Sequence, residues 1–344
     1  MADITALAAA ILDAIEEPAL IVSGNRTLAA NRAALALLGN AIVGRDLRFA
    51  IRQPLALETI ASTSEAEVDV VGIGSADRPW HLSARTLTDE SILVRLSDRS
   101  QLVAAERMRT DFVANASHEL RTPLATIIGY AETLAEEAPL DEATRSRFGE
   151  TIRGEARRML RIVEDLMSLS RIEADRFRAP DDSIDLGELV AIAIEHAAPL
   201  IERRHCEIVT LIAPDMPPVC GDFGQLLQLA DNLLGNALRY GSTPDECRIE
   251  VEVRRNGMRG GLIVRDHGDG IAPEHIPRLT ERFYRVNSAR SRDSGGTGLG
   301  LAIVKHIVER HRGLFELRST LGQGTEVTVW LPIDEAAQAG VIKP

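Results

Sequence analysis

The sequence predicts a multidomain α+β protein, and three stretches with different periodicity carry that prediction. Residues 1–98 place helical segments before strand-like ones, an order typical of an α+β domain. Residues 99–176 are helical in pattern almost throughout, which predicts an antiparallel helical hairpin. Residues 184–335 alternate helices and strands, as expected of a two-layer α/β sandwich. A chain of 344 residues is long enough for these domains, with residues 336–344 as a small polar tail.

The first stretch is read from short runs bounded by turn-forming residues. Ser23-Gly24-Asn25-Arg26 and Gly39-Asn40 are turn signals that end the runs before them. We expect helices over residues 4–15 and 31–38, and strands over residues 19–22, 66–71, 80–87 and 91–96.

The helical hairpin is predicted from one apolar stripe and one helix break. A first helix is expected over residues 102–135, Pro139 then breaks the helix, and Asp141 can cap the next one. In the second helix, apolar residues recur at steps of three, four and seven: Phe148, Ile152, Met159, Ile162, Val163, Leu166 and Leu169. Because a hairpin cannot bury such a stripe alone, we expect a homodimer in which two chains form a four-helix bundle. Residues 177–183 are predicted to be a linker.

Charge and hydropathy exclude several classes of function. The formal net charge is −12, from 39 Lys and Arg against 51 Asp and Glu, which argues against binding nucleic acid or an anionic membrane. The apolar segment 4–22 is interrupted by charged residues and Pro18, so it falls short of the roughly 18 continuous apolar residues that span a bilayer. The start lacks a basic region and a cleavage site, so we expect a cytoplasmic protein without direct membrane insertion.

The three cysteines, Cys206, Cys220 and Cys247, lie far apart and form no Cys-x-x-Cys pair. We therefore expect reduced, buried thiols, with neither a zinc site nor a disulfide framework.

Residues 111–128 contain the first candidate catalytic group. His118 lies in the middle of the predicted helix with Glu119 beside it. Neutral imidazole is a good nucleophile near neutral pH, and an adjacent carboxylate can accept the Nδ1 proton while Nε2 attacks phosphorus. Pro123 removes a backbone donor one turn later and is expected to bend the helix there. Taken alone, His118 could equally be an ordinary surface histidine.

Residues 228–240 and 262–271 hold candidate nucleotide contacts. Asn232 and Asn236 are four residues apart, so both amides face one side of a helix, and an amide oxygen is a suitable ligand for Mg²⁺. Asp266, followed by Gly268 and Gly270, comes after a strand-like run, where a carboxylate can accept a hydrogen bond from an adenine amino group. The same residues could instead cap a helix or form a simple turn.

A glycine-rich segment follows at residues 295–304. Its glycines allow backbone N–H groups to approach phosphates, and the apolar run after them begins a helix whose N-terminus favours anions. Residues 287–294 are polar and basic, which suits a lid over a nucleotide. No Walker-type G-x-x-x-x-G-K-[ST] sequence occurs, and the H-R-D and D-F-G partners of serine/threonine kinases are missing.

The string Ser-His-Glu-Leu-Arg-Thr-Pro at 117–123 closely resembles the phosphoacceptor box of histidine kinases. The later segments follow in the order that the same family has them, ending with Gly322-Gln323-Gly324-Thr325. The resemblance covers roughly residues 105–332, and this core resembles phosphate-regulon-type sensor kinases. It implies the ATPase fold shared with gyrase, the heat-shock chaperone and the mismatch-repair ATPase.

The resemblance also implies residue roles. His118 would be the phosphoacceptor, Glu119 its acid–base partner, and Thr122 would position water for dephosphorylating a partner protein. Asn236 would bind Mg²⁺, Asn232 would lie near the phosphates and Asp266 would bind adenine. The other implied nucleotide-binding residues are Arg239 (where the family more often has lysine), Tyr240, Gly268, Gly270, Phe283, Arg285, Gly296, Gly298, Leu299, Gly300 and Thr325.

Residues 8–98 resemble a PAS domain in the order of their segments and in their place before the kinase core. No cysteine precedes Cys206, which argues against a flavin–cysteinyl photosensor, and His81 could ligate haem or face solvent. A pocket for a small apolar ligand, a docking surface and a dimer contact all remain open.

Together these features predict a sensor histidine kinase. It would use ATP and Mg²⁺ to phosphorylate His118, pass the group to an aspartate of a response regulator, and dephosphorylate that partner. The alternatives are an ATP-binding signalling scaffold or phosphatase-locked sensor without net kinase activity, and an ATPase clamp of the gyrase or chaperone type, which has no use for the string around His118.

Overall fold

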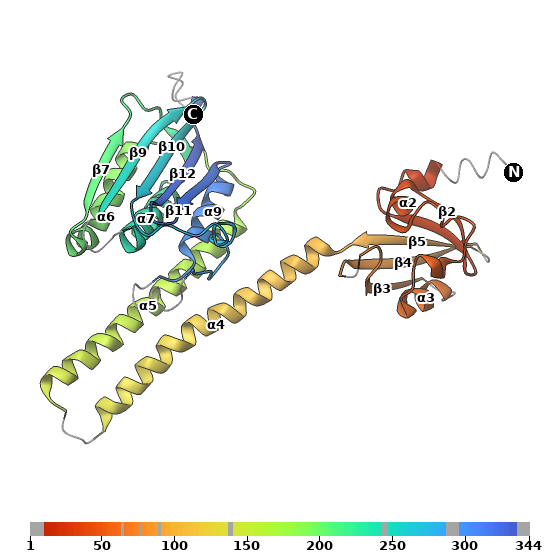
Figure 1. Ribbon diagram of the computed structural model, residues 1–344, viewed down its shortest axis with the longest axis horizontal. Coiled ribbons are helices and arrows are strands. Elements are labelled where there is room, and N and C mark those ends of the chain that lie inside the picture. The colour runs from red at the N-terminus through yellow and green to blue at the C-terminus, as the bar shows by residue number, and fades with distance from the viewer. Residues whose placement is uncertain are drawn as a thin grey trace. The chain divides into compact units, whose positions relative to one another are not determined.

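The computed structural model describes residues 10–62, 65–75, 77–88, 91–136, 140–241, 247–286 and 296–335 (Figure 1). The chain divides into two compact units, Met1–Val113 and Ala114–Pro344, and each is described by itself.

The first unit is built on a five-stranded antiparallel sheet with the strand order β2-β1-β5-β4-β3. Its strands are β1 (Ala19–Ser23), β2 (Arg26–Ala30), β3 (Ala66–Val71), β4 (Pro79–Thr88) and β5 (Ser91–Asp98). Between β2 and β3 lie α2 (Arg32–Leu38), η1 (Leu47–Phe49) and α3 (Pro54–Ala61). The expected strands and the helix at 31–38 are confirmed, whereas β2, η1 and α3 were not predicted. Residues 10–13 of the expected first helix are helical, and residues 4–9 lie outside the described part.

A buried asparagine, Asn31, joins α2 to the sheet of this unit. Asn31 is the N-cap of α2, and its Oδ1 accepts hydrogen bonds from the N–H groups of Ala34 at 2.8 Å and Ala19 at 3.0 Å. One polar side chain thereby satisfies a donor of the helix and a donor of β1, which is why a polar residue is tolerated there. The apolar core beneath it includes Leu20, Ile73, Trp80, Leu82 and Leu96.

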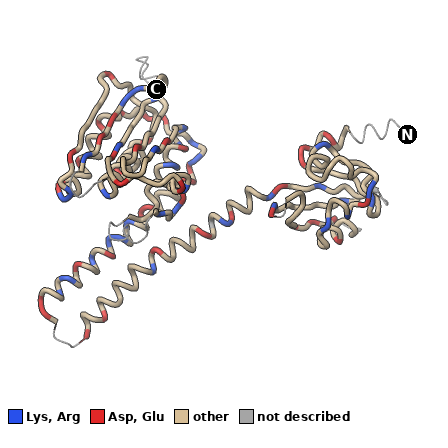
Figure 2. Tube along the Cα trace, in the orientation of Figure 1, with Lys and Arg blue, Asp and Glu red and all other residues tan. Residues whose placement is uncertain are grey.

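The helical hairpin consists of α4 (Ser100–Ala135), which crosses from the first unit into the second, and α5 (Glu142–Ala174). Asp141 caps α5 as predicted, since its Oδ1 accepts from the Thr144 N–H at 2.8 Å. The rings of Tyr130 and Phe148 pack across the hairpin with their centroids 4.8 Å apart. Helix α4 continues through Pro123, so this proline does not end the helix. Figure 2 shows acidic and basic residues interspersed along α5.

The rest of the second unit is a five-stranded sheet with helices against one face (Figure 1). Its order is β11-β12-β10-β9-β7, antiparallel except for the parallel pair β7·β9. The strands are β7 (Glu207–Ile212), β9 (Arg248–Asn256), β10 (Arg259–Asp266), β11 (Leu314–Thr320) and β12 (Gly324–Pro332). The helices are α6 (Leu186–Arg204), α7 (Phe223–Tyr240), α9 (Gly300–Arg310) and the short η2 (Ile276–Arg278). The mixed helix-and-sheet architecture predicted from the sequence is therefore present.

Two expectations for this unit were wrong. The last two residues of the predicted linker, 182 and 183, belong with Ile184 to a strand, β6 (Asp182–Ile184), which pairs with β8 (Val219–Gly221). Cys206 and Cys247 are joined by a disulfide rather than being separate thiols. The reason is topological: each precedes one strand of the parallel pair β7·β9, so residues 41 apart in sequence become neighbours.

None of the helices in the described ranges combines the length and the apolar character needed to cross a bilayer.

Candidate functional site

The candidate phosphoacceptor lies exposed on α4. His118 is accessible to solvent, and the hydroxyl of Thr122, one turn on, donates to the His118 carbonyl at 3.3 Å. Glu119 is partly buried, and its carboxylate accepts a hydrogen bond from Arg158 of α5 at 2.9 Å. The hairpin therefore presents the histidine outward and turns the neighbouring carboxylate inward.

Arg158 is an unusual residue for the inside of a hairpin. Its side chain is only 8% exposed, and it pairs with Glu119 and, at 3.9 Å, with Glu155. Its Nε makes no hydrogen bond within the described part of the chain. A buried guanidinium is costly unless it is paired, and the carboxylates of Glu119 and Glu155 provide that pairing for Arg158.

Helix α7 carries the two predicted asparagines to the start of α9. A Cβ built at Gly300 would lie 2.8 Å from Oδ1 of Asn232, so the two helices touch where α9 begins. Asn236, one turn further on, has its Oδ1 3.4 Å from Nη2 of Arg239. Burial lowers the pKa of the Arg239 guanidinium below its usual range. The N-cap residue of α9, Leu299, offers no side-chain cap, which leaves the first-turn N–H groups for another acceptor.

Asp266 ends β10 at the other side of this region. Its Oδ1 accepts from the backbone N–H groups of Gly268 and Thr325, each at 3.1 Å. Burial raises the pKa of the carboxyl, and the two N–H donors oppose that shift. A Cβ at Gly268 would lie 2.5 Å from the carbonyl oxygen of Tyr240, so only glycine fits between α7 and Asp266. Gly270 has φ 66°, a conformation that favours glycine.

The predicted lid, residues 287–294, lies outside the described ranges, as does residue 295. The glycine-rich segment after this gap contacts Phe283 before it. The Phe283 N–H donates to the Gly298 carbonyl at 2.8 Å, and both residues have positive φ, 64° and 74°. The structure thus brings the two flanks of the predicted lid together. Gly296 belongs to the described flank.

Side chains of this flank contact the hairpin. The Thr297 hydroxyl donates to Asp165 of α5 at 2.8 Å, and burial raises the pKa of Asp165. Arg282 pairs with Glu173, which also lies 3.6 Å from Nε2 of His306. The predicted nucleotide residues and the hairpin therefore share one polar interface.

Arg285, predicted to contact phosphate, lies beside Glu119 of the hairpin in the structure. Its Nη1 lies 3.9 Å from the Glu119 carboxylate, and its side chain is largely buried. The Glu119 carboxylate, next to His118, therefore has two arginines nearby: Arg158 from α5 and Arg285 from the nucleotide region.

The donor set fits a nucleotide with Mg²⁺ better than a protein-only metal cage. Within the described ranges, no group of three or more His, Cys, Asp or Glu side chains is placed to hold a metal. Phosphates suit the uncapped start of α9 at Leu299 and the close backbone contacts at the glycines. A metal ion that keeps part of its water suits the amide oxygens of Asn232 and Asn236.

The sequence interpretation missed Arg158, Asp165 and Glu173. The sequence did contain a signal for Arg158. Glu119 is 20 residues before Pro139 and Arg158 is 19 residues after it, so in a hairpin that turns near Pro139 the two residues lie side by side on the two helices. Asp165 and Glu173 carried no such signal, because their partners belong to another part of the chain.

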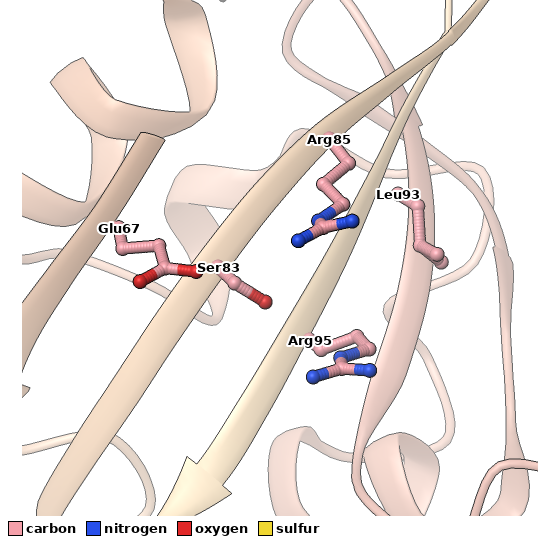
Figure 3. Close-up of a pocket in the computed structure, with 5 residues that line it drawn as sticks. All are labelled: Glu67, Ser83, Arg85, Leu93 and Arg95. Carbon is pink, nitrogen blue, oxygen red and sulfur yellow. The ribbon is translucent and has the colours of Figure 1, made fainter. Parts of the chain in front are cut away.

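The first unit has a hollow of about 290 Å³ on the face of its sheet opposite the core (Figure 3). It is lined by Glu67, Ser83, Arg85, Leu93 and Arg95, and this charged lining does not suit the small apolar ligand considered from the sequence. On the same face, His81 is partly exposed to solvent and lies 2.7 Å from Asp69 and 3.4 Å from Glu67, two exposed carboxylates.

Comparisons with known proteins agree with this geometry. Residues 221–335 match the family model of the histidine kinase-, DNA gyrase B-, and HSP90-like ATPase. Residues 108–175 match the His Kinase A (phospho-acceptor) domain. The phosphate regulon sensor protein PhoR of Pseudomonas aeruginosa is 37% identical over 76% of this chain and 58% of its own length. The sensor-like histidine kinase SenX3 of Mycolicibacterium smegmatis is 38% identical over 72% of this chain and 64% of its own.

Among solved structures, the histidine kinase AdeS of Acinetobacter baumannii aligns with a TM-score of 0.51 and 22% identity, over 63% of this chain and 98% of that one. This likeness shows a shared fold.

The chain belongs to the sensor histidine kinases. Within that family its core is of the PhoR-like type. The chain spans about 58 to 64% of the length of these two relatives.

Proposed function

We propose that this chain transfers the γ-phosphoryl group of ATP to His118. The observation that supports this most directly is the combination, within one compact unit, of an exposed histidine beside Glu119 and a glycine-bounded region with Asn236 and Asp266. Nε2 of His118 attacks the γ-phosphorus, the bond to ADP breaks, and the Nδ1 proton passes to Glu119.

The nucleotide would be held by groups at both ends of this region. Asp266 would accept a hydrogen bond from the adenine amino group. The N–H groups at the start of α9 would donate hydrogen bonds to phosphate oxygens, with Asn232 and Arg239 close by. The walls of the nucleotide site would be formed by Tyr240, Thr325 and the glycines at 268, 270, 296, 298 and 300. When bound, Mg²⁺ would take Asn236 Oδ1 as a ligand and neutralise phosphate charge. The Arg285 guanidinium would contact the phosphates only after it has moved away from Glu119.

The arrangement described here does not favour transfer as it stands. Glu119 is paired with Arg158 and lies near Arg285, so the carboxylate is occupied by cations rather than by His118. The nucleotide region must therefore leave its contacts at Asp165 and Glu173 before phosphorylation. This pairing favours a state with low kinase activity, as in the alternative of a phosphatase-locked sensor without net kinase activity.

We further propose a homodimer that phosphorylates a response regulator and, through Glu119 and Thr122, dephosphorylates it. A row of exposed apolar side chains along the hairpin supports the dimer, because these residues lack a cover within one chain: Leu124, Ile128, Leu160, Val163 and Met167.

The domain boundaries follow the same scheme. Residues 1–98 form a PAS-like sensor domain, 99–176 the dimerisation and phosphotransfer domain, and 184–335 the catalytic domain. The antiparallel strand order of the first unit, with its helices between β2 and β3, supports the first assignment.

The test is incubation with γ-labelled ATP and Mg²⁺, beside His118→Gln and Asp266→Asn. Label that is acid-labile and alkali-stable is expected on the wild type and on neither variant. If the His118→Gln protein binds ATP and keeps the label, the phosphoacceptor assignment is wrong. Binding of ATP without label on any protein would favour the scaffold.

A further inference from the structure

Two cysteines form a disulfide at the end of the catalytic sheet, outside the site described above. Cys206 lies just before β7 and Cys247 just before β9, and their Cα atoms are 4.5 Å apart. The next residues, Glu207 and Arg248, are partners in the parallel pair of strands. The two sulfur atoms are therefore brought together by the sheet register itself.

The backbone holds this pair in place without help from sulfur. The Glu207 N–H donates to the Cys247 carbonyl at 2.8 Å, and the Cys206 N–H donates to the Ile201 carbonyl at 3.0 Å. His205 adopts a left-handed conformation, φ 49°, which turns the chain from α6 into β7. Because these backbone hydrogen bonds do not involve sulfur, we expect two thiols here to remain neighbours, so that the bond can form and break without refolding.

The pair adjoins the segments that surround Asp266. Ile249, two residues after Cys247, is the β9 partner of Asp266 in β10. Gly241, six residues before Cys247, packs on the same residue, since a Cβ there would lie 2.2 Å from Asp266 Cβ. Cys247 thus lies on the stretch of chain that joins two contacts of the candidate adenine ligand.

We propose that Cys206 and Cys247 are a reversible thiol–disulfide pair through which a peroxide changes nucleotide affinity. One thiolate attacks a peroxide oxygen, giving a sulfenic acid and, after protonation, one water. The second thiol displaces the sulfenic oxygen as another water and forms the S–S bond. Peroxide is thereby reduced by two electrons, and a dithiol reductant reverses the change.

The slight solvent exposure of Cys206 and Cys247 suits attack on a small oxidant. The two residues are 8% and 9% exposed, which leaves an approach for peroxide and little room for a bulky reagent. The third cysteine, Cys220, lies on β8 and provides an internal reference thiol.

The disulfide ties β7 and the end of α6 to the strand beside Asp266. The covalent link limits fluctuations that the backbone hydrogen bonds alone allow, so less ordering remains when nucleotide binds, and the oxidised protein should bind ADP more tightly, by about three- to tenfold. This second half of the proposal rests on the proposed nucleotide site, whereas the thiol chemistry does not.

The test uses the full chain reduced with dithiothreitol, then treated with hydrogen peroxide, and a Cys206→Ser/Cys247→Ser double variant. After denaturation, a mass-tagged maleimide should label three cysteines in reduced protein and one after peroxide, with three restored by dithiothreitol. Cys220→Ser should change from two labels to none. Three labels persisting after peroxide, or a loss that dithiothreitol does not reverse, would overturn the proposal.

Affinity is then measured by calorimetry with ADP and Mg²⁺. Weaker binding by reduced wild type and by the double variant, whatever its treatment, is the expected result. Equal affinity of oxidised and reduced wild type overturns the regulatory role even if the disulfide forms. If neither form binds ADP, the nucleotide-site proposal fails, and the labelling result still decides the thiol chemistry.

Discussion

Replacing Arg158 by methionine should increase autophosphorylation. The arginine holds Glu119 through a 2.9 Å charge-assisted hydrogen bond, and its side chain is 8% exposed. A bond of this kind contributes about 1.5–3 kcal/mol. In the proposed mechanism this energy must be given up before Glu119 accepts the His118 proton. Methionine keeps most of the apolar volume and leaves Glu119, itself 28% exposed, accessible to water.

The lower end of that range sets the expected size of the effect. Removing about 1.4 kcal/mol from the barrier raises a rate about tenfold, and other steps limit any larger gain. The assay is the initial rate of labelling from γ-labelled ATP at saturating nucleotide. Arg157→Met, one position away and exposed on α5, is the matched control and should leave the rate unchanged.

Arg158→Lys keeps the charge and should stay near the wild-type rate, although it loses the planar fork. A fall in rate for Arg158→Met, with an unchanged far-ultraviolet circular dichroism spectrum, would refute this reasoning. It would mean that the buried guanidinium supports the reaction rather than withholding Glu119.

Three further changes test other parts of the structure. Asp266→Asn should abolish ADP binding in calorimetry yet raise the melting temperature at pH 7. Burial raises the pKa of this carboxyl, so its ionisation above that pKa costs the folded state stability, and a neutral amide avoids that cost. A lower melting temperature would contradict this. Asp98→Asn should lose about 1 kcal/mol at pH 7, after allowance for solvent screening, because hydrogen bonds from Arg78 and Ser100 lower the pKa of Asp98 to about 2. That stability is present above the unfolded pKa of 3.8 and is lost toward pH 2, so chemical denaturation of the two proteins should converge there, and a constant difference would count against the pairing. Gly298→Ala should weaken ATP binding several-fold, because φ is 74° and a Cβ would lie 2.9 Å from the Phe283 backbone; unchanged affinity would show that this contact does not shape the site.

Local patterns were enough to predict the hairpin and the groups on it. Asp141 caps α5 because its side chain reaches an N–H only three residues away, and such information is contained in the sequence. The spacing of Asn232 and Asn236 places both on one side of α7 for the same reason.

Contacts between distant segments could not be predicted in this way. Thr297 and Asp165 are 132 residues apart, and nothing near either of them indicates the other. The link between Cys206 and Cys247 depends on which strands of the sheet are neighbours, and the placement of Arg285 near Glu119 depends on how the nucleotide region contacts the hairpin. The candidate site residues could be proposed from their residue types and spacing. The contacts that join the nucleotide region to the hairpin depend on tertiary packing, which the sequence pattern does not contain.

The most direct test of the central claim is to locate the phosphoryl group on the chain. Protein incubated with ATP and Mg²⁺ is digested at mildly alkaline pH, where phosphohistidine survives, and the peptide containing residues 111–128 is sequenced by tandem mass spectrometry. Phosphate on His118, lost on brief acid treatment, is the predicted result. Phosphate on a serine or threonine, or on another histidine of the chain, would contradict it.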